Sequence, residues 1–432
     1  MHRHDLLRHM SDVLGVLGNV VDPGGRRGRW SVLLASLVVC LMAWSTAPAM
    51  CDRFADAMKT LGRTLPASAR GRAYNGLFKA LARQWGRVQG PLKNDFRRRA
   101  LELMDRVNDW LILAVDGSKV ELPRTRANRR GFGIADNGAG PQAFVTAIVH
   151  VLTGLVWDWR LGPARSSERG HLASMIKRLP PRTLLLMDAY YTGYDLWTAL
   201  ITHQTHWLMR IGGNVRLIQD LFPGRVQIDR RAGIVYLWPQ NARTDADPLR
   251  LRLIRVGGRK NGIYLLTTVL ESTRLPRARA GELYRMRWGV EVFYRSIKQV
   301  MGAAKMGSRT PARARLELNW TIIAAAVLAL LSVGVLIKKR TDPSRWSFAG
   351  ALRVVRSGLH EECLGCGPRR RSLTSRLAGA LKDTYERTSR KRSRHRPRTT
   401  NTPARLQAPR IEHAATPLQQ HARHTNPVSL AA

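Results

Sequence analysis

Acidic residues are scarce in this sequence. Asp and Glu together number 30 against 72 Lys and Arg, which gives a formal net charge of +42 over 432 residues. A chain with this imbalance repels itself unless a polyanion neutralises it, and the commonest use of such charge is to replace the counterions on nucleic acid. Hydrophobic residues still make up 44% of the chain, enough to bury a sizeable core. The composition therefore indicates a globular protein with a nucleic-acid partner.

Cysteine is also scarce. The chain has four cysteines, Cys40, Cys51, Cys363 and Cys366, and their number and uneven placement exclude a disulfide framework and fit a reducing compartment. Cys363 and Cys366, with His360 before them, resemble half of a zinc site, but the chain contains no second pair to complete it. We expect a cytoplasmic protein without structural zinc.

Long apolar runs are limited to two. The first, residues 31–44, lies too far inside the chain for a signal peptide and is typical of a buried helix. The second, residues 320–337, carries no charge and reaches the minimum length of a membrane-spanning helix. It fits either a span or a core helix that is apolar on all sides, and its many alanines in a strongly basic chain favour the core helix. We expect no membrane partner.

Changes in texture along the chain predict three parts. Residues 1–100 combine helical apolar patterns with clusters of arginine, which predicts a small helical DNA-binding domain. Residues 101–385 carry most of the strand-like and helical runs, with an all-β insertion at about 213–275 made of short β runs separated by turn residues. Residues 386–432 are rich in Arg, Ser, Pro, Thr and His with almost no apolar periodicity, which predicts a disordered basic tail.

Residues 101–385 are predicted to form a mixed α/β sheet. Strand-like runs begin at residue 111 and again at 144, where the run is broken at Thr153-Gly154 as in a hairpin. A helix at about 171–178 follows, and then the runs LLLMDA and HWLMRIG with a helix between them. This order predicts a meander of three strands followed by strands that pair in parallel.

Two acidic residues close apolar strands. Asp116 follows Leu111–Val115, and Asp188 follows Leu184–Met187. A carboxylate at the carboxyl end of a buried strand points out of the sheet, where α/β folds place their sites. Two such acids at close range disfavour each other's ionisation unless a divalent cation lies between them. Each acid alone also fits a simple turn cap, but the pair indicates a site for Mg²⁺ or Mn²⁺.

A third acidic residue lies in the segment YRMRWGVEVFYRSIKQ. Tyr284, Arg287, Glu291 and Lys298 are spaced by 3, 4 and 7 residues, which predicts that they share one face of a single helix. Glu291 can complete a metal site, while the cationic side chains and the phenol can contact phosphates. By spacing alone, a solvated face with internal ion pairs is an equal alternative. The apolar residues between them favour a packed helix whose charged stripe faces a cleft.

These positions carry a resemblance to a known family. The order Asp116, Asp188, Glu291, with a β-rich stretch before the Glu and the pattern Y-x2-R-x3-E-x6-K, resembles bacterial insertion-sequence transposases of the DDE class, in the branch named for its YREK signature, over roughly residues 105–385. One departure is that Asp188 continues into Ala189 where the family usually has a glycine close by.

The resemblance implies a specific function. It implies a ribonuclease H-like core, two Mg²⁺ or Mn²⁺ ions held by Asp116, Asp188 and Glu291, and hydrolysis and strand transfer at the ends of an insertion sequence. It also implies DNA contacts from Tyr284, Arg287 and Lys298, and a base-stacking role for an aromatic residue, for which Trp238 is the candidate. The expected partners are the double-stranded DNA of transposon ends and target, bound by a homodimer in the bacterial nucleoid.

Two alternatives stay open at this point. A nuclease of the same fold would use the same acids without joining strands, and a remnant of a transposon would bind DNA without catalysis. A core-residue role for Trp238 is also open, because an isolated tryptophan in a strand is usually buried.

Overall fold

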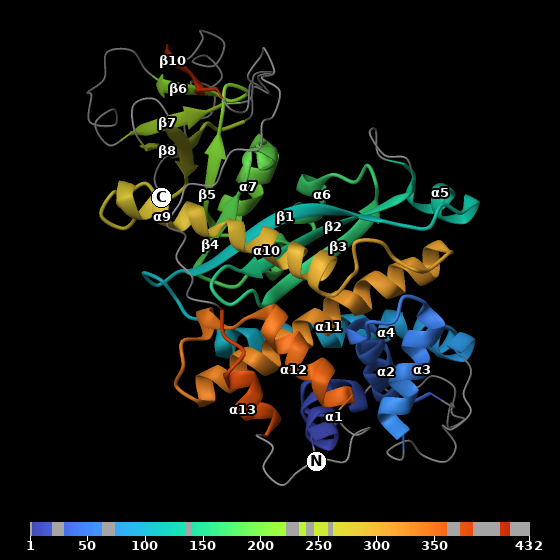
Figure 1. Ribbon diagram of the computed structural model, residues 1–432. Helices are drawn as coiled ribbons and strands as arrows, with labels where there is room; N and C mark the ends of the chain where they lie inside the picture. The colour runs from blue at the N-terminus through green and yellow to red at the C-terminus, as the bar shows by residue number, and fades with distance from the viewer. Residues whose placement is uncertain are drawn as a thin grey trace, which may run out of the picture. The chain divides into compact units, whose positions relative to one another are not determined.

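The protein folds into helices and strands that the computed structural model describes for residues 2–19, 30–62, 74–134, 140–221, 233–238, 246–257, 262–360, 372–382 and 407–414. Backbone contacts divide the chain into two compact units, whose helices and strands are labelled in Figure 1. Unit 1 contains residues 1–105, 117–166 and 289–384, and unit 2 contains residues 106–116, 167–288 and 385–432. The units interleave along the chain, so the predicted domain at 101–385 is divided between them, although unit boundaries also fall at 105 and 384, close to its predicted ends.

Unit 1 is largely helical. Its helices and strands are α1 (His2–Val13), η1 (Gly15–Asn19), α2 (Val32–Trp44), α3 (Met50–Leu61), α4 (Tyr74–Leu103), the second half of β1 (Leu111–Glu121), α5 (Arg126–Phe132), β2 (Gln142–His150), β3 (Val156–Pro163), most of α10 (Trp288–Arg295), the π-helical turn η6 (Ser296–Val300), α11 (Pro311–Lys338), η7 (Pro343–Arg345), α12 (Phe348–His360) and α13 (Leu373–Ala378).

The core of unit 1 is built around α11. This helix packs against α2 and α4 on one side and against α12 and α13 on another. It is also the one described helix that is long and apolar enough to cross a membrane, but 83% of its apolar window is buried inside the protein. The predictions of buried helices at 31–44 and 320–337 are therefore confirmed, since α2 is buried along almost its whole length as well.

The helices predicted for residues 1–100 are present, but they do not form a unit of their own. The Trp44 indole donates to the Ala324 carbonyl oxygen of α11 at 3.3 Å, and α4 packs on β3. Residues 1–105 therefore share one core with the hairpin β2–β3, which is antiparallel and has a bulge at Ile148 and Val149.

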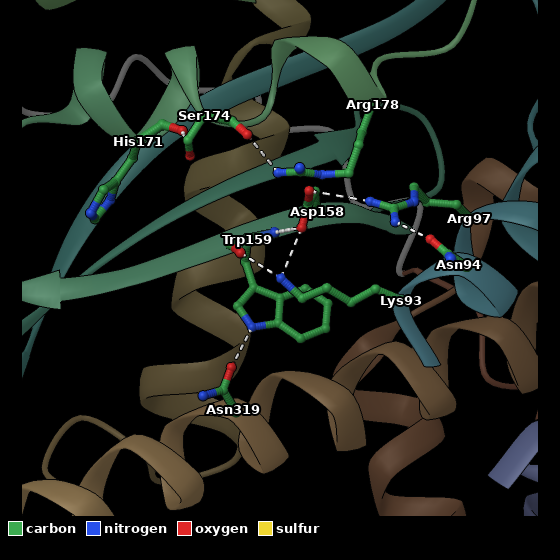
Figure 2. Close-up of polar contacts among 9 residues, drawn as sticks. All are labelled: Lys93, Asn94, Arg97, Asp158, Trp159, His171, Ser174, Arg178 and Asn319. Atoms are coloured by element: carbon green, nitrogen blue, oxygen red, sulfur yellow. Dashed lines mark hydrogen bonds and ion pairs between the residues drawn. The ribbon is translucent and has the colours of Figure 1, made fainter. Parts of the chain in front are cut away.

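A buried carboxylate ties α4 to β3. Figure 2 shows Asp158 of β3, whose side chain is 1% exposed, between Lys93 and Arg97 of α4. The Lys93 ammonium lies 2.9 Å from Oδ1 and the Arg97 guanidinium 3.2 Å from Oδ2, while the Trp159 backbone N–H donates to Oδ1 at 2.8 Å. The Trp159 indole donates to Asn319 of α11 at 2.8 Å. This network joins two helices to one strand.

Unit 2 is a sheet with helices on it. Its elements are the first half of β1, α6 (Glu168–Ala173), η4 (Ile176–Arg178), β4 (Thr183–Met187), η5 (Ala189–Tyr191), α7 (Tyr194–Thr202), β5 (His206–Ile211), β6 (Arg216–Asp220), β7 (Ile234–Leu237), β8 (Leu249–Val256), β9 (Ile263–Thr267), α9 (Arg277–Met286) and β10 (Arg410–Ala414).

The sheet of unit 2 has the order β10-β6-β7-β8-β9-β5-β4-β1. β4 is parallel to β1 and β5 is parallel to β4, as the sequence predicts. β9 pairs antiparallel with β5, β8 with β9, and β7 with β8. Among the described residues, the β-rich stretch at 213–275 therefore contains strands, as predicted, and these strands extend the main sheet.

Helix α9 packs closely on the sheet of unit 2. A Cβ atom at Gly281 would meet Val256 Cγ1 of β8 at 2.6 Å, so the absence of a side chain permits this approach. Because α9 carries Tyr284, its contact with β8 fixes the position of part of the predicted site.

Part of the predicted tail is ordered. Residues 410–414 form β10, which pairs in parallel with β6 in register from Arg410 with Arg216 to Ala414 with Asp220. The prediction of disorder is wrong for these residues, because an unpaired sheet edge can bind a strand of low hydrophobicity through backbone hydrogen bonds alone. The rest of 386–432, together with Cys363 and Cys366, lies outside the described residues.

Candidate active site

The two predicted acids lie on neighbouring strands of unit 2. β1 and β4 pair in parallel with Leu111 opposite Thr183 and Ala114 opposite Leu186. Continued by two residues, the same offset sets Asp116 opposite Asp188, on strands that lie about 4.8 Å apart. Asp188 directly follows β4, as predicted, but the prediction that Asp116 closes its strand is wrong: the apolar run ends at Val115, whereas the extended backbone of β1 continues to Glu121.

Asp188 is oriented by the turn that follows β4. Its side chain accepts a hydrogen bond from the Tyr190 backbone N–H at 2.8 Å and caps the short helix η5. Packing and a hydrogen bond hold this turn in place: Tyr191 is buried, and its carbonyl oxygen accepts from the Trp197 indole at 3.0 Å. A buried tyrosine thus anchors the turn in the segment where the family usually has a glycine.

Arg287 lies beside Asp116. Its guanidinium is 3.9 Å from Asp116 Oδ2, and the side chains are 16% and 17% exposed. This separation is that of an ion pair. Both groups remain partly exposed, so the guanidinium can also approach an anionic ligand there.

Tyr284 belongs to the same cluster. Burial raises the pKa of its phenol, and the nearby carboxylate of Asp188 raises it further, while Arg287 and Arg210 oppose the shift. The phenol is also hydrogen-bonded to the backbone of Arg210. With a raised pKa, Tyr284 keeps its proton at neutral pH. Unit 2 therefore brings together four of the predicted site residues, Asp116, Asp188, Tyr284 and Arg287.

Glu291 and Lys298 belong to unit 1. Glu291 lies on α10, and Lys298 lies on the π-helical turn η6. Lys298 donates from Nζ to Ser118 Oγ of β1 at 2.7 Å. Burial lowers the pKa of Lys298, and Glu121 opposes this shift. The hydrogen bond to Ser118 therefore holds Lys298 beside β1.

The segment that carries the signature is not a single α-helix. α9 ends at Met286, Arg287 forms a turn, α10 begins at Trp288, and residues 296–300 form a π-helical turn. The prediction of one continuous helical face is wrong, because the spacing of residue types does not report a change of helix type. The packing prediction holds for Val290, Phe293 and Ile297, which are buried. It is wrong for Trp288 and Val292, which are 51% and 41% exposed.

Trp238 is a core residue in the structure. It is 5% exposed, clusters with Ile218 and Leu221, and its indole donates to the Ala246 carbonyl oxygen at 2.7 Å. A base cannot reach the face of this ring in the arrangement described. The hydrogen bond satisfies the indole N–H, so burial costs nothing further, and the core alternative for Trp238 is the one that fits.

Two residues at the site were missed in the sequence. Ser118 stands two positions after Asp116, and residues two apart in a strand share a face, which was an available signal. Arg210 is a cation inside the otherwise apolar strand β5. A charge in such a strand signals a partner at the sheet edge, but it does not identify Tyr284 as that partner.

The donor chemistry fits a divalent cation in part. Carboxylate oxygens on neighbouring strand ends are the hard ligands that Mg²⁺ and Mn²⁺ prefer. Within the residues that the structure describes, no group of three or more His, Cys, Asp or Glu side chains is gathered closely enough to hold a metal ion. Asp116 and Asp188 on the neighbouring strands β1 and β4 supply two carboxylates of the kind that such a cation prefers.

The fold and the site are those of an α/β enzyme. Acids on neighbouring parallel strands of a mixed sheet lie where such enzymes bind their ligands. The chain belongs to the family with a transposase DDE domain, whose model matches residues 109–327, from the start of β1 into α11. The matched range contains every predicted metal ligand.

The chain is also similar to individual transposases. It is 26% identical over 209 residues to the transposase InsG for insertion sequence element IS4 of Escherichia coli (strain K12), and the match covers 46% of each chain. It thus spans about half the length of the curated relative it matches. Among solved structures it is similar to the piggyBac transposase in a synaptic complex with hairpin DNA, with a TM-score of 0.40, 11% identity, and coverage of 89% of this chain and 84% of that one.

Proposed function

We propose that the protein is a DNA transposase that cuts phosphodiester bonds at the ends of an insertion sequence and joins the freed strands to a target. The observation that carries the proposal is the parallel pairing of β1 with β4, which brings Asp116 and Asp188 onto neighbouring strands beside Arg287 and Tyr284. Membership of the DDE family and the similarity to InsG support it.

The proposed site uses three acids. Asp116, Asp188 and Glu291 would hold two divalent ions, which supply Lewis acidity and a water of lowered pKa when bound. Tyr284 stays protonated and can donate to a phosphate oxygen. Arg287 and the ammonium of Lys298 balance the charge of the scissile and neighbouring phosphates.

A ribonuclease H-like core is the fold that we propose for this site. The support is the arrangement about β1, with the parallel strands β4 and β5 following it in unit 2 and the hairpin β2–β3 in unit 1. Joining two ends requires two active sites, so we also propose a homodimer on double-stranded DNA, acting in the bacterial nucleoid, with DNA contacts from the N-terminal helices.

The test is cleavage of labelled duplexes that carry the element's own ends, with Mg²⁺, Mn²⁺ or EDTA. Asp188→Asn is compared with Asp195→Asn, which alters an exposed acid on α7 of the same unit. We expect metal-dependent nicking and joining that only Asp188→Asn abolishes. Nicking without joining would indicate a nuclease, and salt-sensitive binding without any cutting would leave a non-catalytic remnant.

A further inference from the structure

A basic surface in unit 1 is built from residues other than those of the proposed active site. It is formed in unit 1 by α5, the residues just before it, and the chain that leads into α11. We call it the α5 face, and its cationic members are Arg124, Arg126, Arg129, Arg130, Lys305 and Arg309. All six side chains are exposed, and within the described part of the chain none of them forms an ion pair with a carboxylate.

The α5 face is held rigidly by hydrogen bonds. Thr125 caps α5 by accepting from the Asn128 N–H at 3.1 Å, and its hydroxyl donates to the Arg309 carbonyl oxygen at 2.8 Å. The buried Asn128 amide donates to the Ser308 carbonyl oxygen at 3.0 Å. A Cβ at Gly131 would meet Pro311 at 2.5 Å, so α5 touches the first turn of α11 closely. Because the backbone of α5 is already fixed, binding a ligand there costs little backbone entropy.

A polar cavity adjoins this face. It has a volume of about 120 Å³ and is lined by Arg124, Lys305, Glu121 and Gln142 together with Leu122, Gly140 and Pro141. Two cations and one carboxylate leave an excess of one positive charge, which matches a phosphodiester with a single negative charge. Gln142 Oε1 is buried without a hydrogen-bond partner, and such an acceptor is costly unless an occupant or its water donates to it.

The spacing of the cations on α5 fits a backbone contact. Arg126, Arg129 and Arg130 are three and four positions apart, so they stand on one side of the helix. A helix of seven residues is about 10 Å long. Because phosphates on one DNA strand recur every 3.4 Å along the duplex axis, this length spans about three of them. Guanidinium groups suit such contacts because they bind phosphate oxygens in pairs.

We propose that the α5 face binds the backbone of target DNA. The inference rests on the proposed function, because strand transfer requires a second duplex beside the transposon ends. Tyr284, Arg287 and Lys298 are already proposed to contact the ends. The α5 face offers clustered cations that contact phosphates of any sequence, which suits a target that is not chosen by a fixed sequence.

The experiment compares two double variants of the full-length protein. Arg129→Ala with Arg130→Ala removes two adjacent cations from α5, and Lys338→Ala with Lys339→Ala removes two adjacent exposed cations from the far end of α11. Binding of a random-sequence duplex is measured from 50 to 200 mM salt, a range chosen because the slope of log K is well defined there. End nicking and joining to a target plasmid are measured separately, and thermal unfolding checks that both variants are folded.

The expected result is specific to α5. The α5 variant should lower the magnitude of the salt slope by about 1.8, since each phosphate contact contributes about 0.9. It should also reduce target joining about tenfold or more with end nicking unchanged, and the α11 variant should change neither. An unchanged slope in the α5 variant, an equal fall in both variants, or a parallel loss of nicking and joining would overturn the proposal. If the parent protein does not cut DNA, the proposed function fails, while the salt slopes still decide whether this face binds duplex.

Discussion

Asp158 of β3 and Asp116 of β1 have different surroundings. Asp158 is 1% exposed and receives Lys93 and Arg97 within 3.2 Å, so two cations of α4 neutralise it inside the protein. Asp116 is 17% exposed, and the Arg287 guanidinium lies 3.9 Å away. A buried carboxylate paired with cations of a neighbouring helix serves the fold, whereas a partly exposed one beside the end of β4 stands where α/β folds place their sites.

The largest effect on activity should come from replacing the Asp116 carboxylate by an amide. Asp116→Asn should lower the rate of DNA cleavage by roughly 10³-fold, because a metal ligand contributes several kcal/mol to the barrier. Stability should hold or rise by less than about 1 kcal/mol, because like charges on paired strands repel. Single-turnover cleavage and urea unfolding measure the two quantities. A loss of stability that accounts for the loss of rate would contradict the contrast with Asp158.

The same change at Asp158 should act on the fold. Asp158→Asn leaves two half-buried cations without a counter-charge, and we expect the free energy of unfolding to fall by about 3 kcal/mol. Asp95→Asn on the same helix is the control, since its partners Arg98 and Arg99 are 58% and 30% exposed and the loss should cost less than about 1 kcal/mol. Urea denaturation compares the three proteins. Equal losses in both variants would show that Asp158 is no more than a surface ion pair.

The stability of unit 1 should also depend on pH through His150, which is buried and neutral. Burial lowers the pKa of His150 to about 4, and its ring bonds Thr153 Oγ1 at 2.8 Å and the Asp105 carbonyl oxygen at 3.2 Å. The unfolded chain takes up a proton below about 6.5 while the folded one does not until about 4. Stability should therefore fall as pH drops through this window, by on the order of 3 kcal/mol.

His150→Gln should remove this part of the pH dependence. Thermal unfolding from pH 4 to pH 7.5, a range that brackets the unperturbed histidine pKa of about 6.5, compares the variant with the parent. Parallel stability curves for the two proteins would refute the assignment to His150.

The smallest effect should come from the support of Lys298. Ser118→Ala removes the oxygen that accepts from Lys298 Nζ at 2.7 Å, and we expect kcat for strand cleavage to fall roughly tenfold, in line with the loss of a charged hydrogen bond. KM for end DNA should change little if Ser118 only positions the lysine. Ser118→Thr keeps a hydroxyl on a strand and should restore kcat. Equal rates in the alanine and threonine variants would show that the hydroxyl has no role.

Part of this contrast was visible in the sequence. An apolar run that ends in Asp predicts a strand with an acid at its end; Asp188 follows that rule, whereas β1 continues past Asp116 to Glu121. The buried helices α2 and α11 were predictable because their runs lack charge on every side. Asp158 also carried a signal, since it lies between Trp157 and Trp159 in β3, but a local pattern cannot say that its partners come from α4, about sixty residues earlier in the chain.

The parts that were predicted wrongly depend on contacts distant in sequence. Trp238 is buried by Ile218 and Leu221, which no local pattern connects to it. The pairing of β10 with β6 is likewise set by an open sheet edge and not by the composition of the tail. The break at Arg287 and the π-helical turn at 296–300 follow from packing on the strands, because residue types at these positions are also compatible with an unbroken α-helix.

The π-helical turn also changes what a residue count means. A wide turn of this kind is an α-helix with one residue inserted, so the interval from Glu291 to Lys298 counts positions and not turns. Deleting Gln299 would leave the Glu291-to-Lys298 spacing unchanged in any alignment, but it would rewind residues 296–300 from a π turn to an α turn. Because Lys298 lies within that turn, its side chain would change direction. A chain that keeps every letter of the signature would then lose the contact between Lys298 and Ser118, and pattern searches would not detect the loss.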